Sequence, residues 1–328
     1  MTTKTTEAAD TAPPAETALP TDTTLPTEAD RTAEATAAGP AVEHTRAPGH
    51  ARAHDYDRTH TPAYVHGYSP AEARRLGDQA DTLAELLHAG TAYPAGSRVL
   101  EAGCGVGAQT VHLLASSPGA ELTAADISAD SLGAARARVA AQAPGARVTW
   151  HHGDLHELPF ADDSFDHLFV CFVLEHLADP SAALTALRRV LRPGGTITVI
   201  EGDHGSTFFH PDSAAARATV DHLVRLQADA GGDALVGRRL HPLLADAGFR
   251  DVAVRPLTVS VDGSRPALVE GFTRRTFVAM VESVRADALA AGLTTAAAFD
   301  RGVADLRRTA EEGGTFHYTF FKAVAVNP

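Results

Sequence analysis

The chain has 328 residues, of which 44% are hydrophobic and 21% are charged, so it can bury the core of an ordinary globular protein. Its formal net charge of −13 disfavours a nucleic-acid partner, because an acidic surface repels phosphate backbones. No apolar run approaches the roughly 20 residues that span a bilayer, and no signal-peptide pattern is present, so we expect a cytoplasmic protein without a membrane partner.

Residues 1–62 are rich in Thr, Ala, Pro and Glu and show no apolar periodicity. Such a segment buries too little apolar surface to offset the entropy that is lost when it is ordered. We therefore expect a disordered N-terminal tail over 1–62, followed by one domain over 63–328.

A helix is predicted directly after this tail. Ser69 has the properties of an N-cap, Pro70 suits the first helical position, and Glu72 completes a capping box. Leucines at helical spacing then extend the pattern over Pro70–His88.

Strands and helices alternate beyond this helix, which is typical of βαβ units and a parallel sheet. The intervening helices are expected at about Val106–Ser116, Ala129–Gln142 and Pro180–Leu191. The strands are expected at Arg98–Ala102, Glu121–Asp126, Val148–His152, Phe165–Cys171 and Thr196–Glu201.

The alternation is interrupted after Glu201 by helical segments that are too long for ordinary loops. They surround two more strands, Val252–Val261 and Thr315–Val326, and lie at about Pro211–Ala230, Gly237–Ala247, Pro266–Ala291 and Thr295–Glu311. The predicted fold is α/β, doubly wound, with a mostly parallel seven-stranded sheet. Helical lid insertions are expected at about 203–250 and 264–312.

A glycine-rich turn, Glu101–Gly107, follows the first strand and precedes a helix. Glycines at this place let the backbone turn sharply and approach a ligand closely. Gly103, Gly105 and Ala108 also satisfy a dinucleotide fingerprint, with Asp126 at a suitable distance for a ribose. This pattern leaves an NAD-dependent oxidoreductase open.

Three features favour a different cofactor. The carboxylate of Glu101 suits a cationic sulfonium better than a pyrophosphate. Asp154 follows the third strand, where it can accept a hydrogen bond from an adenine amino group, and Leu191–Gly195 forms a sharp turn into the fifth strand. In this order the motifs resemble those of class I S-adenosylmethionine-dependent methyltransferases, close to the ubiquinone/menaquinone-type and natural-product branch. The resemblance covers Tyr68–Glu201 and implies a Rossmann-like fold.

The resemblance also implies roles for individual residues. Glu101, Gly103, Gly105 and Gly107 would form the cofactor loop. The other implied cofactor contacts are Asp126 with the ribose hydroxyls, Ile127, Asp154 and Leu155 around the adenine, Cys171 and Phe172 on the floor beside the methyl donor, and Tyr68 and Gln79 in a segment that closes over the cofactor. From the residues alone, Asp126 and Asp154 could instead cap the helices that follow them.

Methyl transfer needs a base only when the acceptor must lose a proton, and histidine suits this task because its ordinary pKa lies near neutrality. His204 is our first candidate and His210 the second, because both follow the fifth strand. Tyr318, in the last strand, either reaches the substrate or packs in the core. The two isolated cysteines make no four-ligand zinc site, and we predict no metal. A metal site formed by His204, His210, Asp203 and His317 is the alternative, although nothing in their spacing demands it.

The sequence therefore predicts a methyltransferase that acts on O, N or C of a small metabolite, in specialised (natural-product) biosynthesis. The alternatives are the NAD-dependent oxidoreductase and a non-catalytic cofactor-binding partner protein. The sequence leaves open whether the protein is a homodimer.

Overall fold

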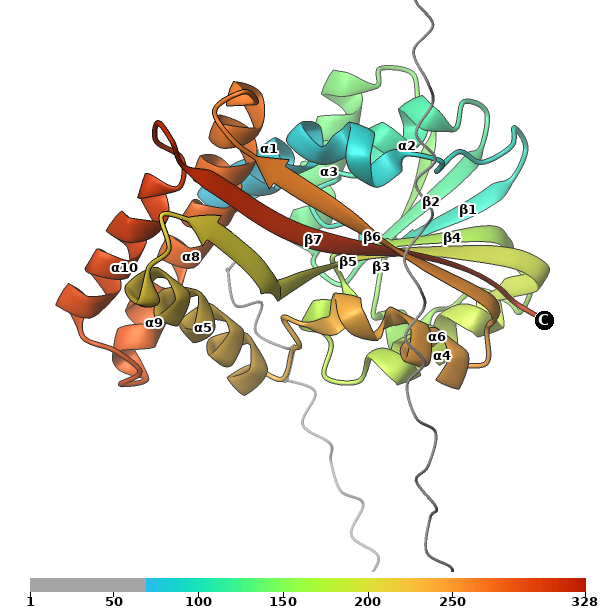
Figure 1. Cartoon of the computed structure of the whole chain (residues 1–328). Coiled ribbons are helices and arrows are strands. Elements are labelled where there is room, and N and C mark those ends of the chain that lie inside the picture. Colours follow the sequence, from blue (N-terminus) through green and yellow to red (C-terminus); the bar gives the residue numbers. More distant parts are fainter. Residues whose placement is uncertain (1–68) are drawn as a thin grey trace, which may run out of the picture. The chain divides into compact units, whose positions relative to one another are not determined.

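The computed structural model describes residues 69–328 (Figure 1). The expected tail at 1–62 and the predicted cofactor contact Tyr68 lie outside the described residues.

The central element is a seven-stranded sheet with the order β3-β2-β1-β4-β5-β7-β6. Pairing is parallel from β3 through β5, whereas β7 runs antiparallel to both β5 and β6. This topology confirms the predicted doubly wound, mostly parallel α/β fold. The strands are β1 (Arg98–Ala102), β2 (Glu121–Asp126), β3 (Val148–His152), β4 (Phe165–Cys171), β5 (Leu191–His210), β6 (Arg250–Val261) and β7 (Thr315–Val326).

Side chains alternate between the two faces of the sheet, and each face builds its own core. On β4, Phe169 and Cys171 belong to one hydrophobic cluster, whereas Leu168 and Val170 belong to the other. Figure 1 shows α1, α2 and α3 on one side of the sheet and α4 and α6 on the other. These helices are α1 (Pro70–His88), α2 (Thr110–Ser116), α3 (Ala129–Gln142), α4 (Pro180–Val190) and α6 (Leu240–Asp246).

A second group of helices gathers beyond the carboxyl ends of the parallel strands, at the left of Figure 1. The α5 and α10 helices pack against each other, and a π-helix, η4, packs against α1. This group consists of α5 (Ala214–Asp229), α7 (Pro266–Leu268), η4 (Val269–Val278), α8 (Ala279–Ser283), α9 (Arg285–Ala290) and α10 (Ala296–Arg308), and short 3-10 helices form η1 (Leu155–Glu157), η2 (Leu174–His176) and η3 (Val236–Arg239).

The boundaries of two predicted elements are wrong by the largest margins. The β5 strand begins at Leu191, so the residues predicted as a sharp turn, Leu191–Gly195, belong to the strand. The β5 strand continues to His210, so residues 203–210 are strand and the helical part of this insertion begins only at Ala214. Pairing of Phe208 with His317 in β7 sustains this extension. The α2 helix begins at Thr110, not at Val106, because positive φ angles at Gly105 (51°) and Gly107 (74°) interrupt a right-handed helix.

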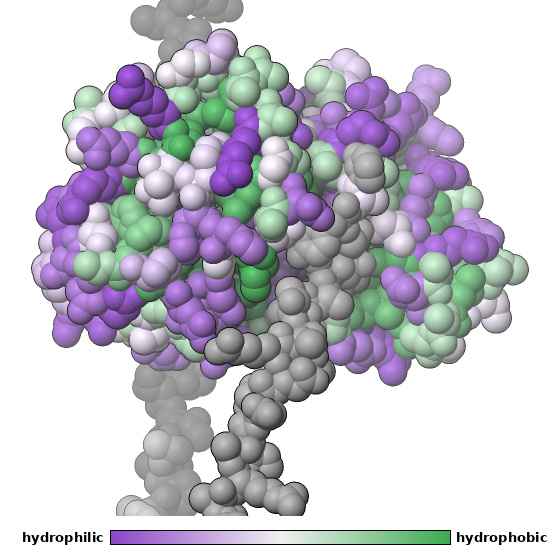
Figure 2. All heavy atoms as spheres, turned by 180° about the vertical axis from the view of Figure 1, so that it is seen from behind, coloured by the Kyte–Doolittle hydropathy of each residue, from purple (hydrophilic) through white to green (hydrophobic). Residues whose placement is uncertain are grey.

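Hydrophilic side chains are spread between smaller hydrophobic areas on the face shown in Figure 2. No helix in residues 69–328 is long and apolar enough to cross a membrane.

Candidate active site

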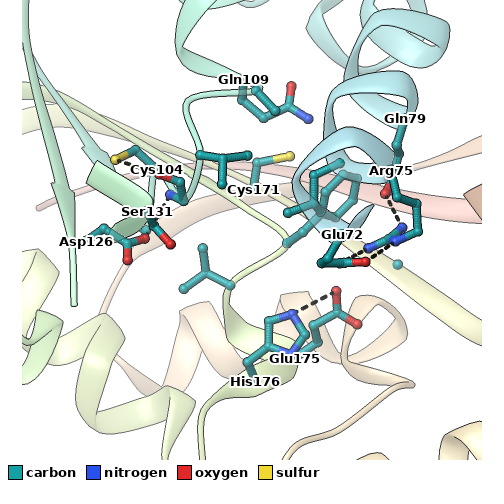
Figure 3. Close-up of a pocket in the computed structure, with 18 of the residues that line it drawn as sticks. Glu72, Arg75, Gln79, Cys104, Gln109, Asp126, Ser131, Cys171, Glu175 and His176 are labelled. Carbon is teal, nitrogen blue, oxygen red and sulfur yellow. Dashed lines mark hydrogen bonds and ion pairs between the residues drawn. The ribbon is translucent and has the colours of Figure 1, made fainter. Parts of the chain in front are cut away.

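A cavity of about 570 Å³ lies at the carboxyl ends of the central strands, beneath α1 (Figure 3). Its size falls in the range of small-molecule sites. The chain leaves β1 toward β2 and β3 and later returns on the other side of β1 as β4. This reversal is the switch point at which doubly wound sheets bind ligands.

The glycine turn is held tightly against β2 and forms one wall of the cavity. The backbone amides of Gly103 and Cys104 both donate to the carbonyl of Ala125, at 2.8 and 2.9 Å. Gly103 has a φ of 77°, and a Cβ there would lie 2.5 Å from Val173 Cγ2. Only glycine therefore fits this close approach.

The other two glycines of the turn differ in their positions. Gly105 lines the cavity, and a Cβ added to it would enter open space. Gly107 is not among the lining residues, because it packs against Ala135 of α3. The structure therefore corrects the cofactor role predicted for Gly107 to one of helix packing.

Asp126 lies at the end of β2 and faces the cavity (Figure 3). Its Oδ2 accepts the Gly105 amide and its Oδ1 accepts the Ser128 amide, both at 2.8 Å. Burial raises the pKa of Asp126. The N-cap of α3 is Ser128, so the alternative of Asp126 as the cap is wrong.

The predicted adenine contacts lie at the same end of the cavity, and Ile127, Asp154 and Leu155 all line it. Asp154 also caps the short η1 helix, where its Oδ1 accepts the His156 amide at 2.9 Å. The capping alternative for Asp154 is therefore confirmed, while its contact with the adenine stays a prediction.

Glu101 does not line the cavity, contrary to the direct cofactor contact that the sequence suggests. Its buried carboxylate lies behind the glycine turn and accepts the Thr110 hydroxyl at 2.6 Å. Burial raises its pKa to about 8. Glu101 therefore supports the turn from behind and carries a proton near neutral pH.

The floor of the cavity begins with Cys171 and Phe172. Phe172 has a φ of 58°, which is rare for a residue with a side chain and is frequent at functional sites. The amides of Val173 and Leu174 donate to Glu201 Oε1 at 3.0 and 2.8 Å, which holds this turn in place.

The α1 helix supplies polar side chains that point toward the cavity (Figure 3). Arg75 donates to both oxygens of Glu72, at 2.6 and 2.7 Å, and to Gln79 Oε1 at 3.0 Å. Gln79 thus lies where the sequence predicts, whereas Glu72 and Arg75 were missed as site residues. Their spacing of three and four residues could have placed them on the face of Gln79.

The far end of the cavity contains His204 of β5 and Tyr318 of β7. His204 Nδ1 lies 2.7 Å from the Tyr318 hydroxyl, and His204 Nε2 lies 3.9 Å from Glu175 Oε2. Burial lowers the pKa of His204, so the ring is neutral at pH 7. His210 is exposed at the end of β5 and does not line the cavity, so the structure corrects its predicted catalytic role.

Apolar side chains surround this polar pair. The π-helix contributes Phe272 and Phe277, α8 contributes Met280 and β7 contributes Phe320. Figure 1 places these helices over the carboxyl ends of the strands. The cavity thus has a near end at the glycine turn and a far end beside η4 and α8, where apolar side chains surround His204 and Tyr318. Within residues 69–328, no group of three or more His, Cys, Asp or Glu side chains is arranged to hold a metal ion.

The fold and the cavity define a doubly wound α/β protein with a cavity of ligand size at its switch point. A methyltransferase-domain family matches residues 100–199. This match supports the resemblance to class I S-adenosylmethionine-dependent methyltransferases that the motifs of the sequence carry.

The chain spans about half the length of the curated relatives that it matches. An uncharacterized 37.1 kDa protein in transposon TN4556 of Streptomyces fradiae is 37% identical over 194 residues, which are 58% of this chain and 54% of that protein. Methyltransferase GfsG of Streptomyces halstedii is 33% identical over 138 residues, 42% of this chain and 49% of that protein. Demethylmenaquinone methyltransferase of Clavibacter sepedonicus is 41% identical over 107 residues, 33% of this chain and 42% of that protein.

The residues at the near end of the cavity fit S-adenosylmethionine. The open space at the Gly105 Cβ position provides a cradle for the cofactor, and Asp126 offers carboxylate oxygens for ribose hydroxyls. Arg75 is the one Lys or Arg side chain that lines the described cavity, and it is bonded to Glu72. The charge of the cavity therefore suits a cation such as a sulfonium.

Proposed function

We propose that this protein transfers a methyl group from S-adenosylmethionine to a small-molecule acceptor. The observation that carries the proposal is the continuity of one cavity, which joins the glycine turn and Asp126 to His204 and the apolar lid residues. A donor and an acceptor that occupy the two ends would meet above Cys171 and Phe172.

The protein would mainly position the two reactants. Bound S-adenosylmethionine supplies a methyl group that is already activated by the positive charge on sulfur. The glycine turn and Asp126 would hold the adenosyl part, while Phe172, Phe272 and Phe277 would exclude water and align the acceptor. Orientation alone can reduce a barrier by roughly 7–11 kcal/mol.

The charges of the cavity support an acceptor that is uncharged or cationic and largely apolar. Asp126, Asp154 and Glu175 line the cavity, whereas Arg75 is neutralised by Glu72. An anionic acceptor such as a phosphate ester would meet net repulsion. The similarity to methyltransferase GfsG and to demethylmenaquinone methyltransferase supports a small-molecule acceptor, and we propose that this acceptor is a metabolite of specialised biosynthesis.

The test combines a binding measurement with a turnover measurement. Calorimetry is expected to show binding of S-adenosylhomocysteine and none of NADH. A metabolite extract incubated with the enzyme and cofactor deuterated in its methyl group is expected to yield a product that carries the labelled methyl. NADH binding would instead support the oxidoreductase, and cofactor binding without any labelled product would support the non-catalytic partner protein.

A further inference from the structure

Three polar side chains meet at the far end of the cavity, among the apolar side chains, and each comes from a different element. Tyr318 lies on β7, His204 on β5 and Glu175 on η2. Their exposed fractions are 1%, 5% and 8%, and all three line the cavity. Buried polar groups are costly unless they are paired, so their arrangement requires an explanation.

The Tyr318 hydroxyl is the hydrogen-bond donor in its contact with His204. Burial raises the pKa of Tyr318 well above its ordinary value, so the phenol keeps its proton, while a hydrogen bond from the backbone of Asp203 acts in the opposite direction. The phenol therefore has a hydrogen to donate, and His204 Nδ1, 2.7 Å away, is the acceptor that lies within hydrogen-bond distance. This hydroxyl also lies against Gly202, where any Cβ would overlap it.

The tautomer of His204 follows from this direction. A neutral imidazole that accepts at Nδ1 carries its hydrogen on Nε2. That nitrogen is buried, has no hydrogen-bond partner among the described residues, and lies 3.9 Å from Glu175 Oε2. The same carboxylate oxygen accepts the side-chain amide of Gln227 at 3.2 Å. Glu175 is thus held where it favours the Nε2–H tautomer and would stabilise an imidazolium.

We propose that Tyr318 takes the proton from the hydroxyl group of the substrate that accepts the methyl group. As it does so, Tyr318 passes its own phenolic proton to His204. The proposal rests on the proposed function and names its substrate class, an alcohol or phenol that is not ionised before it binds. His204 and Glu175 are then positioning residues that act through Tyr318. The arrangement follows the logic of a hydroxyl, an imidazole and a carboxylate in series.

The step balances in atoms and electrons. The acceptor O–H bond breaks and its proton moves to Tyr318 Oη, as the Tyr318 proton moves to His204 Nδ1. The acceptor oxygen bonds to the methyl carbon while the carbon–sulfur bond breaks, and that electron pair stays on sulfur. The products are a methyl ether, S-adenosylhomocysteine and an imidazolium beside Glu175, which later releases its proton to water.

The tautomer is measured without any acceptor. We expect ¹⁵N spectra of the full-length, histidine-labelled protein at pH 7 to show His204 as the Nε2–H tautomer, with its signal assigned through His204→Gln. In Tyr318→Phe the Nδ1 signal is expected to shift, because its donor is lost. In Glu175→Gln the Nε2–H tautomer is expected to be less populated. An Nδ1–H tautomer in the wild-type protein would overturn the relay.

Kinetics with the acceptor from the metabolite screen provide the second test. Tyr318→Phe keeps the aromatic ring and is expected to lower kcat about 100-fold or more, and His204→Gln is expected to have an effect of the same size. Both variants are expected to keep the affinity of the wild-type protein for S-adenosylhomocysteine. Tyr93→Phe is the matched control, because Tyr93 is also buried but lies outside the cavity. It is expected to leave kcat unchanged.

Each remaining outcome separates the relay from the proposed function. If Tyr318→Phe keeps its kcat while His204→Gln loses it, His204 acts directly on the acceptor and the relay is wrong. Methyl transfer only to nitrogen or carbon would support the proposed function and contradict the hydroxyl acceptor. Cofactor binding with no labelled product would instead contradict the proposed function itself.

Discussion

Asp126 has the strongest structural basis of the predicted cofactor contacts. Two backbone amides fix its carboxylate while it faces the cavity, so it is ordered before any ligand arrives. Preordered groups lose little entropy when a ligand binds.

We predict that Asp126→Ala weakens the binding of S-adenosylhomocysteine about 10- to 100-fold, the effect of losing a hydrogen bond to a charged group. Calorimetry measures the change. Asp166→Asn is a suitable control, because Asp166 lies at the opposite end of its strand, where it binds Arg98 and Arg192. Equal affinities of the wild-type protein and Asp126→Ala would remove the ribose assignment.

Glu101 is expected to make stability depend on pH. Burial raises its pKa from 4.5 to about 8, so between these values the folded protein holds a proton that the unfolded chain has released. The contribution of Glu101 to the free energy of unfolding therefore falls as the pH rises through that window. Glu101→Gln keeps an acceptor for Thr110 but cannot ionise.

We predict that the wild-type protein loses stability relative to Glu101→Gln between about pH 5 and about pH 8. Urea unfolding of both proteins at several pH values measures the difference, and other titrating groups cancel in the comparison. A pH-independent difference would show that Glu101 is ionised in the folded protein.

His204 and His210 show where reasoning from the sequence about the site succeeds and where it stops. Both histidines follow the fifth predicted strand, and nothing in their local pattern separates them. Only the pairing of β5 with β7 places one beside Tyr318 and the other at an exposed strand end. Contacts between residues 114 positions apart are not visible in local periodicity.

At the scale of elements, most strand boundaries were predictable, because β1 to β4 and β7 combine apolar runs with clear turn signals on both sides. The β5 strand differs because Gly202 and Gly205 suggest a loop. The strand nevertheless continues, since β7 resumes its pairing after a register shift between Asp203 and Phe208. Tertiary pairing here overrides local propensity.

Gly302 makes the close contact between α10 and α5 possible. A Cβ at this position would overlap Thr219 Oγ1 and lie 2.5 Å from the carbonyl of Ala215. Gly302→Ala is therefore predicted to destabilise the protein by about 1–3 kcal/mol, although alanine is the better helix former. Chemical unfolding measures the loss.

Gly133→Ala provides the matched control for this prediction. Gly133 is exposed on α3, and a Cβ there would meet no atom within 4 Å. The same substitution is expected to stabilise the protein by about 0.5–1 kcal/mol. A loss of similar size in both variants would contradict the packing explanation.

Lys322 links β7 to the end of α1. Its buried Nζ donates to the carbonyls of Leu87 and Ala89, each at 2.9 Å, and to the Thr91 hydroxyl. We predict that Lys322→Met destabilises the protein by about 1–3 kcal/mol, because the carbonyl of the buried Leu87 loses this donor. Hydrogen exchange in residues 70–88 is expected to accelerate.

Arg255→Met is the control, because the exposed Arg255 side chain also donates to the Ala89 carbonyl. Surface changes of this kind usually alter stability by less than about 0.5 kcal/mol. Equal exchange rates of α1 in the wild-type protein and Lys322→Met would show that other contacts hold the helix.

At the scale of the whole molecule, the described residues that line the cavity extend from Ser69 in front of α1 to Phe320 in β7. We predict that removal of residues 1–62 leaves the affinity for S-adenosylhomocysteine unchanged. Removal of residues 1–89, which also deletes α1 with Arg75 and Gln79, is expected to abolish binding. Calorimetry on both shortened proteins distinguishes these outcomes, and a loss with the shorter deletion would contradict the predicted domain boundary.

The position of β7 has a consequence for how the molecule is made. This strand lies between β5 and β6 in the sheet, although it follows both in the chain. During synthesis on the ribosome, the glycine turn and Asp126 therefore emerge well before Tyr318 and Phe320. A nascent chain would be able to recognise its methyl donor before it can receive an acceptor, and the last strand would complete the enzyme by inserting between two strands that are already made.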